Sequence, residues 1–249
     1  MSSPFKVVIP ARYASTRFPG KALVDIAGKP MIQHVFERAL ASGAEQVIVA
    51  TDDQRIQSAA ENFDAEVCMT STAHESGSDR LAEVVSIYNW PDDTIVVNVQ
   101  GDEPFIPPEN IKQVANNIAE RPLASIATLV TEFDNRSELE SSDNVKVISD
   151  RESYALYFSR AVIPYNRDDK DNVNYYRHIG IYAYRVSYLK EFAQLKVAPI
   201  EQYEKLEQLR ALWYGRKISV TVAARKPPPG VDTPEDLKNL LGLIDTQRD

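Results

Sequence analysis

A short basic segment follows the first apolar run of the chain. Arg12, Arg17 and Lys21 fall within residues 12–21, among small residues that let backbone amides approach a ligand. Guanidinium groups form paired hydrogen bonds to phosphate oxygens, and an ammonium adds a compact charge, so the segment is typical of a polyphosphate site. Its residue order differs from the Walker A pattern. A solvated loop without a ligand is the alternative that these residues leave open.

Two acidic residues far apart in the sequence could hold a metal ion beside such phosphates. Asp102 follows a β-rich run and Gly101, and Asp232 lies just before Thr233, which we expect to cap a helix. Carboxylates are the hard oxygen ligands that Mg²⁺ takes beside bound phosphates. The sequence therefore predicts Mg²⁺ as cofactor, held by Asp102 and Asp232, although an aspartate in a turn is common without a metal.

The elements that must position these residues alternate between strands and helices. Continuous apolar runs predict strands at 5–9, 46–50, 66–69 and 94–99. Apolar residues at helical spacing predict helices within 31–40, 56–63, 81–88 and 111–118. This order favours an α/β fold with a mostly parallel, Rossmann-like sheet. Ligands bind at the carboxyl ends of such strands, where the basic segment and Asp102 both lie.

The pattern changes near residue 124. Predicted strands follow one another at 124–130, 144–148, 154–158 and 179–184, with a turn at 149–153. We therefore expect one domain over residues 1–249, with an inserted antiparallel lobe at about 124–185. A helix at 199–214, a strand at 218–223 and a helix from Thr233 are expected to complete the chain.

Apolar side chains crowd the middle of the expected lobe. They are Tyr154, Leu156, Tyr157, Phe158, Val162, Ile163 and Tyr165. Exposed together they would form an unusually large patch, so we expect a homodimer joined through residues 145–165. Packing against the chain's own core is the alternative.

Composition narrows the class of protein. The chain has 249 residues, a formal net charge of −8 and one cysteine, Cys68. The acidic balance argues against a nucleic-acid partner, and a single cysteine allows no intrachain disulfide. No apolar stretch is long enough for a membrane span, and no secretory segment is evident. We expect a cytoplasmic protein with no membrane partner.

Five segments together resemble the 3-deoxy-manno-octulosonate cytidylyltransferase (CMP-Kdo synthetase) family. They are 10–21 (PARYASTRFPGK), 74–80 (HESGSDR), 98–104 (NVQGDEP), 154–160 (YALYFSR) and 230–237 (GVDTPEDL). The resemblance runs in order across nearly the whole chain. It implies a nucleotide-diphospho-sugar transferase type of fold with a dimerisation lobe. Departures such as Ala22, where the family usually has proline, remove no charged group of the motifs.

The resemblance implies a reaction in which CTP and 3-deoxy-D-manno-octulosonate (Kdo) give CMP-Kdo and diphosphate for lipopolysaccharide synthesis. It implies catalytic roles for Lys21, Arg12, Asp102 and Asp232, with Arg12, Arg17 and Lys21 on the triphosphate. The residues that it places around the nucleotide are Ala11, Ser76, Gly77, Arg80 and Gln100. The residues that it places on the sugar acid are Arg160, His178, Tyr182, Glu207 and Gln208.

The residues themselves leave several readings open. His178 could equally be a packing histidine, Tyr182 could be core, and Glu207 would be solvated on a helix, whereas Arg160 at a strand end favours an anion. A cytidylyltransferase for 8-amino-Kdo or another acidic sugar is the alternative within the class. A non-catalytic nucleotide-binding module is disfavoured by the intact charged residues. A Rossmann dehydrogenase lacks its glycine-rich loop here.

Overall fold

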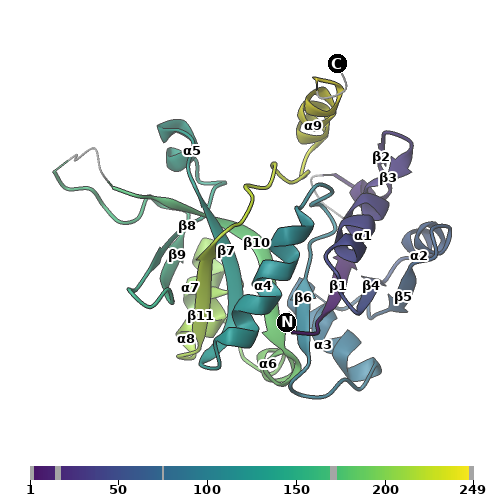
Figure 1. The fold of residues 1–249 in the computed structure, drawn as a ribbon, viewed down its shortest axis with the longest axis horizontal. Coiled ribbons are helices and arrows are strands. Elements are labelled where there is room, and N and C mark those ends of the chain that lie inside the picture. Colours follow the sequence, from purple (N-terminus) through teal and green to yellow (C-terminus); the bar gives the residue numbers. More distant parts are fainter. Residues whose placement is uncertain (1–2, 15–17, 75, 169–172, 247–249) are drawn as a thin grey trace.

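The computed structural model describes residues 3–14, 18–74, 76–168 and 173–246, with side chains as far as residue 242. Within these residues the main sheet has the strand order β11-β7-β10-β6-β1-β4-β5 (Figure 1). One half of it is parallel, with β6 beside β1, β1 beside β4 and β4 beside β5. These strands span Lys6–Ala11 (β1), Gln46–Thr51 (β4), Glu66–Met69 (β5) and Ile95–Asn98 (β6). They confirm the four predicted apolar runs, because strands covered on both faces need apolar side chains on both.

The other half of the sheet contains one strand that runs antiparallel to its neighbours. β10 (Tyr176–Arg185) runs antiparallel to β6 and to β7 (Ala124–Glu132), and β11 (Lys217–Val222) is parallel to β7. The hairpin of β8 (Lys146–Ser149) and β9 (Ala155–Ser159) branches from β10. Of the segment 124–185, expected as an inserted lobe, the first and last strands are thus built into the main sheet.

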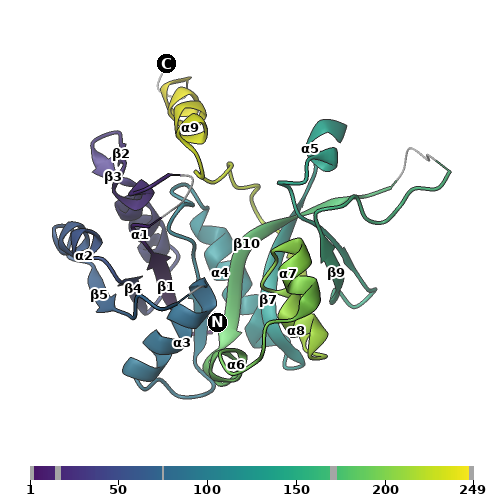
Figure 2. The ribbon, with the colours of Figure 1, turned by 180° about the vertical axis from the view of Figure 1, so that it is seen from behind.

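Helices cover both faces of the sheet (Figures 1 and 2). Those on one face are α1 (Met31–Ala41), α2 (Gln54–Glu61) and α4 (Pro108–Glu120). Those on the other are α3 (Gly77–Ile87), α6 (Val186–Phe192) and α8 (Leu209–Trp213). The faces alternate along β1, where Val7 and Ile9 join the first core and Val8 joins the second. This arrangement confirms the expected α/β layers.

The C-terminal helix closes one end of the molecule. α9 (Pro234–Thr246) begins at the predicted cap, where the backbone amide of Asp236 donates to Thr233 Oγ1. Leu240 and Val231 pack with Ile26 and Met31 in a third, small core. This core fixes the segment that leads into α9 against the amino-terminal part of the chain (Figure 1).

One predicted helix is wrong in a way that matters for the site. The expected helix 199–214 is two short helices, α7 (Pro199–Glu204) and α8, because Lys205 adopts a left-handed φ of 54°. Glu207 and Gln208 therefore lie in a connection rather than within a helix. Five short elements were not predicted: η1 (Lys21–Leu23), β2 (Asp25–Ile26), β3 (Lys29–Pro30), α5 (Arg136–Glu140) and α6.

Candidate active site

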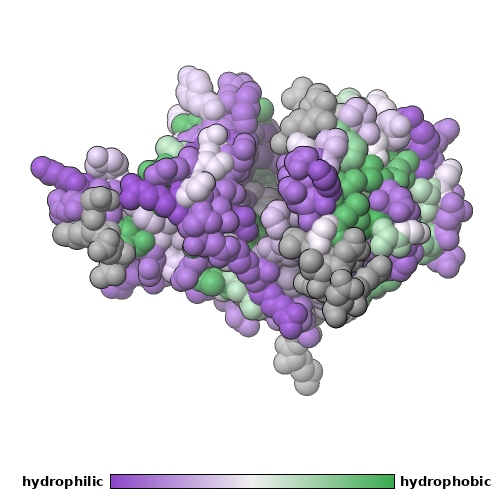
Figure 3. Space-filling model, turned by 90° about the horizontal axis from the view of Figure 1, so that it is seen from above, coloured by the Kyte–Doolittle hydropathy of each residue, from purple (hydrophilic) through white to green (hydrophobic). Residues whose placement is uncertain are grey.

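A pocket of about 520 Å³ opens at the carboxyl ends of β1 and β6. The two strands approach closely there, because a Cβ atom at Gly101 would lie 2.9 Å from the carbonyl oxygen of Pro10. Only glycine permits this contact, which places Asp102 next to the basic segment. The surface is visibly hollowed near the middle of the molecule in the space-filling view (Figure 3). A volume of this size suits a nucleotide-sized ligand.

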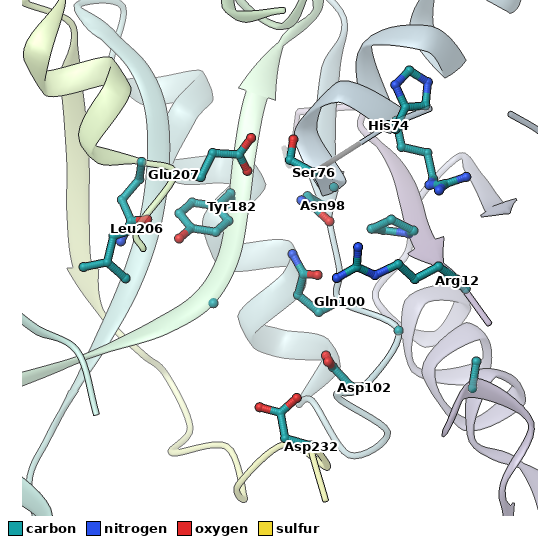
Figure 4. A pocket seen from close by; sticks show the side chains of 18 of the residues that line it. Arg12, His74, Ser76, Asn98, Gln100, Asp102, Tyr182, Leu206, Glu207 and Asp232 are labelled. Carbon is teal, nitrogen blue, oxygen red and sulfur yellow. The ribbon is translucent and has the colours of Figure 1, made fainter. Parts of the chain in front are cut away.

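Both predicted metal carboxylates line this pocket, although they come from distant parts of the chain. The backbone amide of Val231 donates to the carbonyl oxygen of Asp102 over 2.9 Å, and the Val231 side chain is fully buried. A Cβ at Gly230 would lie 3.0 Å from Glu103 Oε1, so glycine again allows the approach. Asp102 and Asp232 consequently sit together at one end of the pocket (Figure 4).

The ammonium of Lys21 lies between these two carboxylates. Its Nζ is 2.5 Å from Asp102 Oδ2 and 2.9 Å from Asp232 Oδ1. Burial opposes the charge of Lys21, but the two carboxylates outweigh it together and raise the pKa of the ammonium. The site thus holds one positive charge at the point where two anionic side chains converge.

These residues fit a magnesium ion. Two carboxylates that already converge on one cation are hard oxygen ligands, and phosphate oxygens and water usually complete an Mg²⁺ shell. Burial, and next the Asp102 charge, raise the pKa of neighbouring Glu103 to about 8. Among the described residues no group of three or more His, Cys, Asp or Glu side chains is arranged to hold a metal.

The expected nucleotide residues surround one side of the pocket. Ala11, Arg12, Ser76, Gly77, Arg80 and Gln100 all line it. Arg12 extends across the opening towards Gln100 (Figure 4). Ser76 caps α3 by accepting a hydrogen bond from the amide of Asp79 at 3.1 Å. Arg17, also expected at the triphosphate, lies outside the described residues.

Arg80 lines the pocket and also bonds to protein groups. It is buried, its Nη2 donates to Asp52 Oδ2 over 2.9 Å, and its Nη1 donates to Thr70 Oγ1. These two bonds fix the start of α3 against the end of β5 and leave further N–H donors on the guanidinium.

The expected sugar residues Glu207 and Gln208 reach the opposite side of the pocket through the break at Lys205. Ser78 Oγ donates to Glu207 Oε2 over 3.0 Å, which links this connection to α3. Burial raises the pKa of Glu207, and the serine hydroxyls oppose that shift.

His178 and Tyr182 line the pocket from β10. The imidazole Nε2 lies 3.0 Å from Thr128 Oγ1, and the ring packs edge-on against Phe158 with 5.1 Å between centroids. Burial lowers the pKa of His178 to about 3, so the ring is neutral at physiological pH. A neutral imidazole can orient a hydroxyl group, but with this pKa it is a weak base.

This environment predicts a pH effect on stability. Between about pH 6.5 and 3 the unfolded chain binds a proton at His178 that the folded chain does not, so stability falls as the pH drops. When the pH drops from 6.5 to 4.5, we expect the free energy of unfolding to fall by about 1–2 kcal/mol less in His178→Gln than in the parent. Urea unfolding at both pH values measures this, with His34→Gln as control. An identical pH dependence in His178→Gln and the parent would contradict the assignment.

Arg160 is not among the residues that line the pocket. Its Nε donates to the carbonyl oxygen of Glu204 and its Nη1 to that of Ser142, each over 2.8 Å. The Glu204 carboxylate in turn accepts from the Arg160 amide at 2.9 Å and from Ser159 Oγ at 2.6 Å. The structure thus joins Arg160 to the connection that carries Glu207.

Arg160→Ala should therefore act through the position of that connection. We expect the KM for the sugar substrate to rise about tenfold, with CTP affinity nearly unchanged, because the side-chain hydrogen bond that holds Glu204 is lost. Glu204→Gln keeps the carbonyl acceptor and should change the KM less. A carboxylate clamp would give a different pattern: Arg160→Ala would lose binding of the sugar acid while hydrogen exchange of residues 204–208 stayed as in the parent.

Three pocket residues with polar side chains were not among the predicted site residues. His74 lines the pocket with its Nε2 2.5 Å from Glu83 Oε2, and Asn98 and Lys205 also contribute to the wall. His74 and Asn98 both lie inside the motifs quoted above, so alternation along 98–102 could have indicated Asn98. Nothing in the local sequence marks the left-handed Lys205.

Comparison with known proteins identifies the family of this chain. A cytidylyltransferase family model matches residues 6–218. A 3-deoxy-manno-octulosonate cytidylyltransferase of Pseudoalteromonas atlantica is 54% identical, over 95% of this chain and 96% of the relative. The chain belongs to the 3-deoxy-manno-octulosonate cytidylyltransferase family. The member of this family from Vibrio campbellii is 55% identical over 98% of both chains.

A solved structure has the same fold as this chain. A CMP:2-keto-3-deoxy-manno-octonic acid synthetase complexed with CTP superposes with a TM-score of 0.91 at 43% identity. The match covers 98% of this chain and 100% of that protein. The family resemblance and the α/β fold expected from the sequence are thus confirmed. Within the described residues, no helix has the length and apolar character needed to cross a bilayer.

Proposed function

We propose that this chain transfers the cytidylyl group of CTP to Kdo, giving CMP-Kdo and diphosphate and so activating Kdo for lipopolysaccharide synthesis. The observation that carries the proposal is the convergence of Lys21, Asp102 and Asp232 at one end of a pocket lined by Arg12. Relatives 54–55% identical over almost their whole length bear the corresponding name.

In this reaction the anomeric 2-hydroxyl of Kdo attacks the α-phosphate of CTP. The bond from the α-phosphorus to the bridging oxygen breaks, diphosphate leaves, and the hydroxyl proton is lost. Arg12 and Lys21 bind the phosphates and meet the charge that develops on the leaving group. Asp102 and Asp232 would hold Mg²⁺, which when bound neutralises phosphate charge and acidifies the attacking hydroxyl. His178, Tyr182, Glu207 and Gln208 orient the sugar acid.

Release of diphosphate tests this proposal directly. The purified protein is incubated with Mg²⁺ and CTP, and with Kdo, 8-amino-Kdo or sialic acid in separate reactions. We expect the highest kcat/KM with Kdo. A clear preference for 8-amino-Kdo would keep the reaction class and change the substrate. No diphosphate with any of the three sugar acids would overturn the proposal.

We further propose a homodimer joined through residues 145–165. Leu156 is 59% exposed and Tyr165 is 85% exposed, which supports an apolar contact there. The exposed apolar patch is smaller than the sequence suggested, because Tyr154 and Phe158 are buried in the chain's own cores. The remaining exposed side chains lie on the hairpin and on the loop that follows it.

Sedimentation velocity at micromolar concentration checks the dimer. We expect twice the monomer mass for the parent and a shift towards monomer for Leu156→Asp combined with Tyr165→Asp, since two buried charges oppose association. Leu40→Asp, which alters an exposed leucine on α1, should leave the mass unchanged. A monomeric parent protein would contradict the dimer.

We place the reaction in the cytoplasm, because CTP is made and used there. The formal net charge of −8 supports small-molecule substrates over nucleic-acid partners. Fractionation of cells followed by the diphosphate assay tests this placement, and activity confined to a membrane fraction would contradict it.

A further inference from the structure

Asn98 is a buried polar residue in the wall of the pocket with no assigned role. Its side chain is 2% exposed, and it stands at the last position of β6. Asn98, Gln100 and Asp102 all line the pocket, whereas Val99 between them is buried in the core. Alternate residues of this segment thus face the pocket, and Asn98 is the one of the three that is farthest along the chain from Asp102.

The side-chain amide of Asn98 has an unused hydrogen-bond acceptor. Within the described residues Oδ1 is buried and has no hydrogen-bond partner. Its Nδ2 lies 3.7 Å from where a Cβ would stand at Gly77, just beyond Pro10 Cγ at 3.6 Å. An unpaired buried carbonyl is unfavourable in the folded protein, so such groups commonly mark ligand sites.

Other buried asparagines of this protein are fully paired. Asn110 Nδ2 donates to the carbonyl oxygen of Arg225 over 2.7 Å, and its Oδ1 accepts from the amide of Arg225 at 3.0 Å. Asn117 bonds through both ends of its amide to Thr221 and Ser219. Asn98 therefore differs from the asparagines that hold the fold together.

The neighbours of Asn98 indicate which substrate supplies the missing donor. Across the sheet it pairs directly with Tyr182 of β10, and Figure 4 shows the two side chains next to each other in the pocket. Among the described residues, two more buried pocket atoms have no hydrogen-bond partner: Gln208 Nε2, and Glu207 Oε1, which lies 4.0 Å from Arg210 Nη2. Together these three atoms offer two acceptors and one donor.

A chain of hydroxyl groups matches this set, because every hydroxyl both donates and accepts. The cytosine base also carries N–H donors, but both are on its one amino group, whereas hydroxyl groups are spread along the tail of a sugar acid. We propose that Asn98 Oδ1 accepts a hydrogen bond from a hydroxyl on the tail of the sugar acid, and that Asn98 helps to select a polyhydroxylated substrate. This inference rests on the proposed function.

Asn98→Ala tests the proposal against a purely structural role. We expect the KM for Kdo to rise about tenfold or more at saturating CTP. The Kd for CTP without sugar acid, measured by calorimetry, should stay within about twofold. The melting temperature should stay close to that of the parent, because no protein hydrogen bond is lost. Asn110→Ala, the matched control, should lower the melting temperature by several degrees and leave the KM for Kdo unchanged.

A substrate analogue sharpens the test. Kdo analogues lacking the 7- or the 8-hydroxyl should be poorer substrates for the parent protein. For Asn98→Ala, one of these losses should shrink to within about twofold of Kdo, because the partner is already missing. Asn98→Ser serves for the same measurements if Asn98→Ala does not fold.

Two results would overturn the inference. In the first, Asn98→Ala weakens CTP binding and leaves the KM for Kdo unchanged, which would assign the amide to the nucleotide. In the second, it lowers the melting temperature as Asn110→Ala does and changes neither substrate. A parent protein that turns over no sugar acid would instead reject the proposed function, so the two failures are distinguishable.

Discussion

Asp102→Asn and Asp232→Asn should each lower kcat with CTP and Kdo by about 100-fold or more while the protein stays folded. The two carboxylates converge on a single cation, Lys21 Nζ, at 2.5 and 2.9 Å. An amide keeps the shape of each side chain but removes the charge that a hard cation requires. Loss of one such contact removes roughly 3 kcal/mol of transition-state stabilisation.

Steady-state kinetics and thermal unfolding measure this prediction together. Asp92→Asn is the control, because Asp92 is exposed and pairs with Lys190 away from the pocket. We also expect EDTA to abolish diphosphate release and added Mg²⁺ to restore it. Full turnover in EDTA, or full turnover of either variant, would show that these carboxylates hold no essential metal.

Lys21→Ala should lower kcat by about 100-fold and change the KM for CTP much less. Lys21 is the residue that contacts both carboxylates, and its raised pKa keeps it charged throughout the physiological range. A fixed charge that meets a leaving diphosphate acts mainly in the transition state, so its loss appears in kcat. Single-turnover kinetics with excess enzyme would separate this step from product release.

Two variants test the geometry of this charge. Arg12→Lys keeps the charge but loses the paired donors of the guanidinium, so we expect lower kcat/KM for CTP. Lys29→Ala, which removes an exposed lysine paired with Glu37, should leave kinetics unchanged. If Lys21→Ala kept the parent kcat and only weakened CTP binding, Lys21 would be a ground-state ligand rather than a catalytic group.

The sequence by itself determined the layered α/β fold and the composition of the site. Apolar runs such as 46–50 and 94–99 form strands because side chains buried on both faces must be apolar along their whole length. The basic segment and Asp102 follow strands, so their place at the carboxyl edge follows from the parallel order. The cap at Thr233 is equally local, since one side chain and the amide three residues later suffice.

Contacts between distant segments decided the rest. Asp232 meets Asp102 because Gly230 and Val231 dock onto residues 102–103, a contact that no local pattern encodes. The left-handed Lys205 breaks a helix that periodicity favours and turns Glu207 into the pocket. Arg160 bonds to the carbonyl oxygen of Glu204, 44 positions along the chain. Propensity and periodicity act over a few residues, whereas these positions depend on which surfaces meet after the chain has folded.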